Sequence, residues 1–177
     1  MSAPHRYRVS AGSFFQTNRH LTDELVSIVT NGMSGQTALD LYAGVGLFAT
    51  ALSGQFGRVV AVESSPQSFA DLEYNSPENV RAVHAAVDEY LERAGGKRRV
   101  DLIVVDPPRG GLGRRVLAGL VKMRPQGLTY VSCDPATLAR DLVPLLAAGY
   151  GVEQAHLVDL FPQTFHIESV LKLALSS

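Results

Sequence analysis

The sequence has a single cysteine among its 177 residues and no tryptophan. One cysteine cannot form an internal disulfide or a cysteine-based cluster, which favours a reducing compartment. No apolar run reaches the length of a membrane-spanning helix, and the first eight residues have no signal-peptide core. The net charge of −1 provides little general attraction for nucleic acid, and the only small basic candidate is Lys97–Arg99. We therefore expect a cytoplasmic protein with no membrane partner.

Hydrophobic residues make up 46% of the chain and charged residues 19%, which is typical of one globular domain. Short apolar strands alternate with amphipathic helices. We expect strands at 37–41, 58–63, 80–84, 100–105, 128–132, 151–159 and 169–175, and helices at 21–30, 47–52, 66–74, 87–93, 114–123 and 135–148. This alternation predicts an α/β fold with a mostly parallel sheet and helices on both faces. Ligands of such folds bind beyond the carboxyl ends of the strands.

A glycine-containing turn, DLYAGVG at 40–46, follows the first expected strand and opens a helix. Its glycines allow close approach of the backbone to a ligand, and Glu63 ends the next strand, where an acid can accept hydrogen bonds from ribose. The pair indicates a cofactor that carries a nucleoside. Because Gly44, Gly46 and Ala49 also fit the loose dinucleotide pattern, NAD remains an alternative.

A second motif, DPPRGG at 106–111, ends the apolar fourth strand. Asp106 is expected at the ligand edge of the sheet, where two prolines stiffen the loop and shape a pocket wall. Arg109 can bind a phosphate or a base, although a solvated arginine is an equal alternative.

The lone cysteine, Cys133, ends a buried strand, and Asp134 and Pro135 suit the start of the next helix. A thiol before a helix N-terminus lies at the positive end of the helix dipole, which predicts a stabilised thiolate. Taken by composition alone, an inert packing cysteine would be the simpler interpretation.

Two further candidate site residues lie near the two ends of the chain. Glu168 precedes an apolar strand between Ile167 and Val170, where burial would raise its pKa and suit it to act as a general base. An exposed acid at the start of a strand is the alternative. Near the N-terminus, SFFQTN at 13–18 places Gln16 after two aromatic residues, and Thr17 or Asn18 would serve as the N-cap of the first helix.

Taken together, these motifs resemble those of the RNA uracil-5 methyltransferase family. Five match in order: SFFQTN at 13–18, DLYAGVG at 40–46, DPPRGG at 106–111, SCDPATLARD at 132–141 and FPQTFHIES at 161–169. The resemblance covers nearly the whole chain. It implies a Rossmann-like class I methyltransferase domain with an antiparallel C-terminal strand.

The resemblance also implies roles for particular residues. S-adenosylmethionine would be the cofactor and a uridine in ribosomal or transfer RNA the substrate. Cys133 would attack C6 of the uracil, and Glu168 would remove the proton from C5 after methylation. Cofactor-binding positions would be Gln16, Tyr42, Gly44, Gly46, Glu63, Asp88 and Asp106, with Asp106 and Arg109 at the substrate.

Members of the family usually carry additional domains for RNA binding before the catalytic one, and many hold an iron–sulfur cluster. Neither is expected here: 1–177 is predicted to be one methyltransferase domain, with 1–20 as its lead-in, and one cysteine cannot hold a four-cysteine cluster. RNA affinity would then reside in a missing N-terminal domain. Two alternatives to an active RNA methyltransferase remain. One is a cofactor-binding or interaction module without useful RNA affinity, and the other is an NAD-dependent enzyme.

Overall fold

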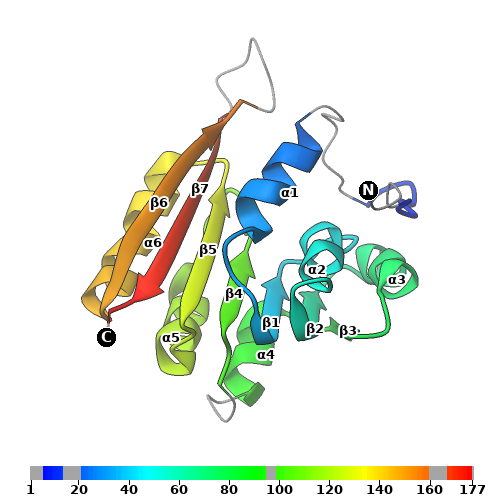
Figure 1. Cartoon of the computed structure of the whole chain (residues 1–177), viewed down its shortest axis with the longest axis horizontal. Helices are drawn as coiled ribbons and strands as arrows, with labels where there is room; N and C mark the ends of the chain where they lie inside the picture. Colours follow the sequence, from blue (N-terminus) through cyan, green and yellow to red (C-terminus); the bar gives the residue numbers. More distant parts are fainter. Residues whose placement is uncertain (1–5, 14–20, 95–98, 160–166, 177) are drawn as a thin grey trace.

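The computed structural model describes residues 6–13, 21–94, 99–159 and 167–176. Helices and strands alternate along the chain as expected (Figure 1). The helices are α1 (Thr22–Thr30), α2 (Leu47–Leu52), α3 (Pro66–Asn75), α4 (Val87–Ala94), α5 (Gly113–Met123) and α6 (Pro135–Ala147). The strands are β1 (Gly35–Leu41), β2 (Phe56–Glu63), β3 (Val80–His84), β4 (Leu102–Val105), β5 (Gly127–Ser132), β6 (Tyr150–Val158) and β7 (Glu168–Leu175).

The seven strands form one sheet in the order β3-β2-β1-β4-β5-β7-β6. The first five strands pair in parallel, and β7 pairs antiparallel with both β5 and β6. The expected class I methyltransferase architecture is therefore confirmed, and most predicted boundaries differ from the observed ones by one or two residues. The predicted N-cap at Thr17 or Asn18 is wrong, because α1 begins at Thr22 with Leu21 in the N-cap position.

Two apolar cores lie on opposite faces of the sheet. In one, residues of α1, α2 and α3 such as Leu25, Phe48 and Leu72 pack against alternate strand residues. In the other, residues of α4, α5 and α6 such as Leu91 and Leu120 pack against the remaining strand residues. Figure 1 shows the two helix layers on either side of the sheet. This double coverage explains why the central strands are apolar on both faces.

The strand order reverses between β1 and β4, which are neighbours in the sheet. From β1 the chain proceeds outward through β2 to β3, and from β4 it proceeds the other way to β5. The loops after β1 and β4 consequently diverge to opposite faces and leave a crevice at the carboxyl edge. The DLYAGVG turn and the DPPRGG loop are these two loops.

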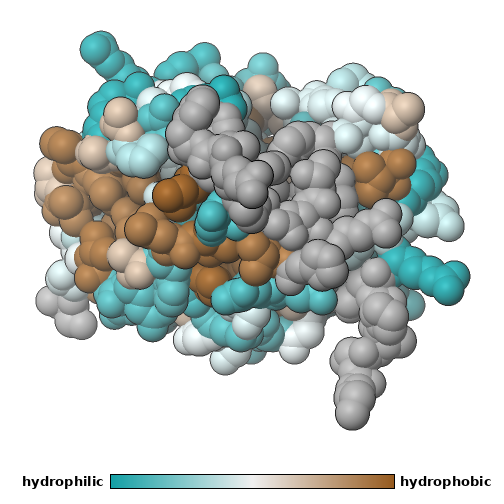
Figure 2. Space-filling model, turned by 90° about the horizontal axis from the view of Figure 1, so that it is seen from above, coloured by the Kyte–Doolittle hydropathy of each residue, from teal (hydrophilic) through white to brown (hydrophobic). Residues whose placement is uncertain are grey.

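Figure 2 views the molecule from above the upper edge of Figure 1, and apolar residues gather there on the side where β6 and β7 lie. Large apolar side chains exposed on α6 and β6 include Val143, Leu146, Val152 and Leu157. Among the helices that the structure describes, none combines the length and apolarity needed to cross a membrane.

Candidate active site

A pocket of about 810 Å³ occupies the crevice at the carboxyl edge of the sheet. Its volume is in the range of clefts that enclose a nucleoside-sized ligand. Residues at or beyond the ends of β1, β2, β4 and β5 line it together with Glu168 at the start of β7, and the lining includes Tyr42, Gly44, Glu63, Asp106, Arg109 and Cys133. The structure thus brings together, in one cavity, motifs that lie up to 126 residues apart in the sequence.

The turn after β1 has an unusual backbone. Tyr42 has φ +66°, Gly44 φ +55° and Gly46 φ +96°. Left-handed backbone at a tyrosine is strained, and such strain persists where the surrounding structure enforces it, frequently at ligand sites. A Cβ atom at Gly44 would meet no atom within 4 Å, whereas one at Gly46 would approach Leu72 Cδ1 to 2.8 Å. Gly46 is therefore needed for packing against α3, and Gly44 leaves an open cradle at the pocket.

Glu63 ties this turn to the start of α3. One carboxylate oxygen accepts from the backbone N–H of Gly44 at 2.9 Å, and the other accepts from that of Ser65 at 2.7 Å. Ser65 in turn caps α3 through Ser68 N–H. Each carboxylate oxygen has a further lone pair that can face a ligand hydroxyl. The sequence suggested only a ribose contact, and the structure adds a role in fixing the turn.

Asp40 received no role from its sequence position, although it belongs to the same turn motif. It is fully buried, and one oxygen accepts from the N–H of Ala49 at 2.8 Å. Its Oδ1 atom has no hydrogen-bond partner among the described residues. Burial and the nearby charge of Glu63 raise the pKa of Asp40 to about 7. The hydrogen bond to Ala49 connects the end of β1 to α2, and Asp40 itself is not among the residues that line the pocket.

Cys133 lies directly after β5, half-buried in the pocket wall. Asp134 caps α6 by accepting from the N–H of Thr137 at 2.8 Å, as predicted. The expected stabilised thiolate is wrong for the unliganded protein, because burial and the charge of Glu168 raise the pKa of Cys133. The Arg109 side chain opposes this shift through a hydrogen bond and its charge. Desolvation and a neighbouring carboxylate outweigh the helix dipole at this position.

Glu168 and Asp106 form the acidic part of the pocket. Glu168 is 7% exposed at the first position of β7, which contradicts the alternative of a solvent-exposed acid. Burial raises the pKa of Glu168. Asp106 follows β4, and burial together with the charges of Glu168 and Asp40 raises its pKa to about 8. Carboxyl groups crowded in this way cannot all be ionised at once, which makes protonation near neutral pH part of the chemistry of the site.

Two predicted site residues, Gly46 and Asp88, are not among the residues that line the main pocket. Asp88 lines an adjoining hollow of about 390 Å³ that shares Tyr42 and Ser64 with the main pocket. Its carboxylate forms an ion pair with Arg115 at 3.0 Å. Gln16 lies outside the described residues, as do Phe161 to His166 of the last motif.

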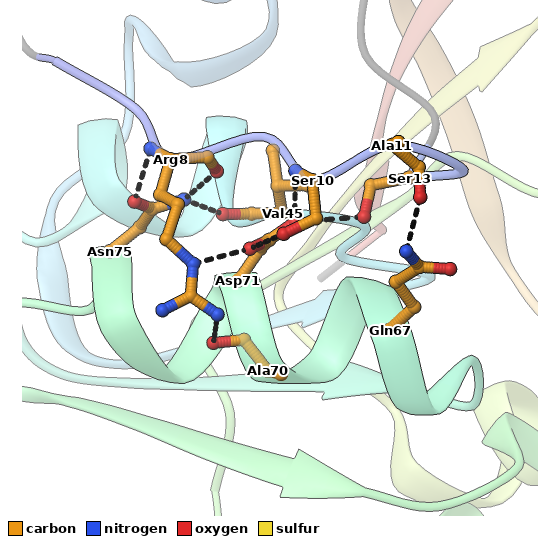
Figure 3. Close-up of polar contacts among 9 residues, drawn as sticks. All are labelled: Arg8, Ser10, Ala11, Ser13, Val45, Gln67, Ala70, Asp71 and Asn75. Carbon is orange, nitrogen blue, oxygen red and sulfur yellow. Dashed lines mark hydrogen bonds and ion pairs between the residues drawn. The ribbon is translucent and has the colours of Figure 1, made fainter.

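Sequence reasoning missed the way in which the N-terminal segment joins the pocket. Gly12, with φ +98°, lines the cavity. The carboxylate of Asp71 on α3 holds the segment on either side of Gly12. It accepts hydrogen bonds from Ser10 N–H at 2.7 Å, Ser13 Oγ at 2.8 Å and Arg8 Nε at 2.7 Å (Figure 3). Asn75, one helical turn further along, donates to the carbonyls of Arg8 and Val45. The one signal available in the sequence was an acidic residue, Asp71, at a position of α3 that faces the protein interior.

Known proteins match this chain over nearly its whole length. The model of the tRNA (uracil-5-)-methyltransferase family matches residues 3–175. A protein from Streptomyces avermitilis, described as an uncharacterized RNA methyltransferase, is 43% identical over 172 residues, which cover 93% of this chain and 40% of the relative. A Thermotoga maritima protein with the same description is 37% identical over 175 residues, covering 95% of this chain and 39% of the relative. The chain therefore spans about two fifths of the length of these relatives.

Solved structures give the same result. The crystal structure of Pyrococcus abyssi tRNA (uracil-54, C5)-methyltransferase in complex with S-adenosyl-L-homocysteine superposes with a TM-score of 0.81 at 32% identity, covering 92% of this chain and 40% of that one. A putative RNA methyltransferase from Pyrococcus horikoshii, at 16% identity and a TM-score of 0.66, shares the fold and covers 88% of this chain and 83% of its own. The match of the family model over nearly the whole sequence shows that this chain belongs to the tRNA (uracil-5-)-methyltransferase family.

Proposed function

We propose that this chain transfers a methyl group from S-adenosylmethionine to C5 of a uridine in RNA through a covalent adduct with Cys133. The observation that carries the proposal is the placement of Cys133, Glu168 and Asp106 in the same pocket as the glycine turn. A nucleophile and a base on one side of a cavity, with a nucleoside cradle on the other, suit methyl transfer between two bound nucleosides.

The chemistry requires a nucleophile because C5 of uracil is itself poorly nucleophilic. Cys133 attacks C6 as the thiolate, after the thiol proton has passed to solvent, which forms an S–C6 bond and moves the electron pair of the C5–C6 double bond toward C5. C5 then takes the methyl group from the sulfonium of the cofactor, which would leave as S-adenosyl-L-homocysteine. Glu168 removes the proton from C5, and the electron pair re-forms the double bond as Cys133 departs as a thiolate. The apolar surroundings that raise the pKa of Glu168 suit it to this proton transfer near neutral pH.

Asp106 is suited to binding the base. With a pKa of about 8, its carboxyl group is largely protonated at neutral pH. A protonated carboxyl donates a hydrogen bond, and a uracil carbonyl is an acceptor whose negative charge increases once C6 has been attacked. Asp106 would then stabilise the adduct, and Arg109 would contact the base or a phosphate of the RNA.

The residues of the pocket fit S-adenosylmethionine, which supplies the methyl group when bound. The open backbone at Gly44 accommodates a close ligand, and Glu63 has lone pairs for ribose. The solved Pyrococcus abyssi relative was crystallised with S-adenosyl-L-homocysteine, which supports this choice over NAD. We assign Gln16, Tyr42, Gly46 and Asp88 to the same cofactor on the family motif alone.

A cofactor-binding module with little RNA affinity is the second candidate. The net charge of −1 favours it. In that case the chain binds S-adenosylmethionine but needs an RNA-binding region outside these 177 residues for turnover.

Uridines in loops or single strands would be the better substrates, since the base must leave its stack to reach Cys133.

The experiment that tests the proposal is incubation of the chain with methyl-labelled S-adenosylmethionine and a panel of unmodified transfer and ribosomal RNAs. We expect label at C5 of uridine, mapped by nuclease digestion and mass spectrometry. Label at another atom or base would contradict the proposal. Saturable cofactor binding without transfer to any RNA, even at low salt, would support the module.

A further inference from the structure

Asp141 is a fully buried carboxylate that the proposed chemistry does not use. It lies on α6, two helical turns after Cys133, and has no exposed surface. Its Oδ2 atom accepts from the backbone N–H of Leu112 at 2.7 Å and from the hydroxyl of Tyr130 at 2.9 Å. Its Oδ1 atom accepts from Arg140 Nε at 2.9 Å and pairs with Arg140 Nη2 at 2.8 Å. Four donors thus converge on one buried carboxylate.

These donors connect the loop that carries Arg109 to the strand and helix that carry Cys133. Leu112 ends the loop after β4, Tyr130 belongs to β5, and Arg140 also donates to the carbonyl of Gly110 at 2.8 Å. The loop is therefore held to α6 at two successive points, Gly110 and Leu112.

The packing around Gly111 shows how close this contact is. Gly111 has φ +77°, and its N–H closes a turn onto the carbonyl of Pro108 at 2.8 Å. A Cβ atom at Gly111 would overlap both the Asp141 carboxylate and Arg140 Nη2. Only glycine therefore allows the loop to lie directly against Asp141, and this turn carries Arg109 to the pocket wall that it shares with Cys133.

We infer that Asp141 is a positioning residue, whose carboxylate holds the 106–112 loop against α6 so that Arg109 stays beside Cys133. The inference rests on the proposed role of Cys133 as the nucleophile. It assigns no contact with substrate to Asp141, which acts through Arg109. The charged groups that face the thiol are Arg109 from this loop and Glu168 from β7.

The inference predicts the sign of a change in thiol reactivity. An Asp141→Asn side chain keeps one acceptor oxygen and turns an amide NH2 group either toward Leu112 and Tyr130 or toward Arg140, so one of the two anchors of the loop is lost. Loss of Arg109 from the thiol would raise the pKa of Cys133. Removal of the Asp141 charge with the loop unmoved would have the opposite effect and lower it, since a negative charge disfavours the thiolate.

Cys133 is the only cysteine of the chain, so the rate of alkylation by iodoacetamide reports on this thiol alone. We would measure this rate in the complete chain from pH 6 to 10. For Asp141→Asn and for Arg109→Ala we expect a higher apparent pKa and alkylation about three- to tenfold slower near pH 7, because thiolate fraction falls tenfold per pKa unit. The double variant should be no slower than Arg109→Ala, since both changes remove one interaction.

Tyr130→Phe is the matched control. It removes one hydrogen bond from the same carboxylate but leaves both anchors of the loop, so thermal stability should fall while the alkylation profile stays that of the parent. If Asp141→Asn does not fold, Gly111→Ala displaces the loop with the carboxylate retained and should give the same slower alkylation. An unchanged or lowered thiol pKa in the loop variant, no effect of Arg109→Ala, or an equal shift in Tyr130→Phe would overturn the inference. The alkylation assay uses neither RNA nor cofactor, so its outcome does not depend on whether the chain transfers methyl groups.

Discussion

Cys133 and Glu168 lie one residue beyond a directly paired couple of the sheet, Ser132 on β5 and Ser169 on β7. Because β5 and β7 are antiparallel, Cys133 leaves its strand at the same edge at which Glu168 enters the next. Register alone therefore places the proposed nucleophile and base at one end of the sheet, and the mouth of the pocket lies there.

Because Cys133 and Glu168 act at different steps of the proposed reaction, their variants should stop it at different stages. Cys133→Ala should form neither adduct nor product, because no group attacks C6. Glu168→Gln should still attack and take up the methyl group, then accumulate a protein–RNA adduct, because the proton on C5 is not removed. Denaturing gels and intact mass spectrometry with an unmodified RNA substrate and S-adenosylmethionine would detect the adduct.

Glu78→Gln, an exposed residue after α3, serves as the control for Glu168→Gln and should turn over like the parent. Normal turnover of Glu168→Gln would assign the base elsewhere. Formation of 5-methyluridine by Cys133→Ala would exclude the covalent mechanism.

Glu63 should matter for cofactor affinity. Glu63→Ala removes the acceptor for Gly44 and Ser65 and the expected ribose contact, so S-adenosylmethionine binding should weaken by about 1–3 kcal/mol. Isothermal titration calorimetry would measure the change, with Glu78→Ala as a control of unaltered affinity. Equal affinities of the two variants would argue against a cofactor role for Glu63, and saturable NAD binding in place of S-adenosylmethionine would reject the cofactor itself.

Asp40 should make stability depend on pH. Its pKa is raised from an ordinary 3.8 to about 7 in the folded protein, so the folded state binds a proton that the unfolded state releases between these values. Stability from this group is present below pH 3.8 and is lost as the pH rises to about 7. Relative to the parent, Asp40→Asn should therefore gain up to about 4 kcal/mol over this interval.

Chemical denaturation of the parent and of Asp40→Asn at several pH values would measure this difference. The prediction concerns how the free energy of unfolding changes with pH in the two proteins, and not the absolute stability of the variant. A difference that stays constant from acid to neutral pH would show that folding does not change the pKa of Asp40.

Asp71 should hold the N-terminal segment to the pocket. Hydrogen bonds from the Ser10 backbone and from Arg8 keep the pKa of Asp71 well below its usual range, so its stabilising effect is present at neutral pH and is lost on strong acidification. Asp71→Asn should lower the melting temperature at pH 7 and speed tryptic cleavage after Arg8. Glu73→Gln, exposed on the same helix, is the matched control. Cleavage rates equal to those of the parent would show that Asp71 does not secure this segment.

The order of elements could be predicted from the sequence because central strands such as β2 and β4 contain unbroken apolar runs, and longer helices such as α5 have apolar residues at helical spacing. Helix ends with a local signal, such as Ser65 and Asp134 as N-caps, were also predictable, since their hydrogen bonds join residues three apart. The N-cap of α1 was not, because Leu21 in that position makes no side-chain capping bond, although the expected start at 21 lies one residue from the observed Thr22.

For the site, the sequence identified the motif residues but not their electrostatics. The helix dipole at Cys133 is a local property and was visible in the sequence, yet the pKa of the thiol is set by Glu168, 35 positions away, and by burial. The same applies to Asp106, whose pKa depends on the carboxylates of Glu168 and Asp40. Neither desolvation nor the distance between charges is encoded in local spacing.

The sequence by itself determined the fold class, the family and the residue types available for chemistry, because hydrophobic periodicity and short motifs depend on neighbours along the chain. Tertiary structure alone decided the partners of the buried carboxylates. Asp71 binds a segment about 60 positions earlier, and Asp141 joins a helix to a loop 29 positions away. A buried charge must find its hydrogen bonds wherever the fold presents donors, so such contacts follow from the packing of elements and not from their order.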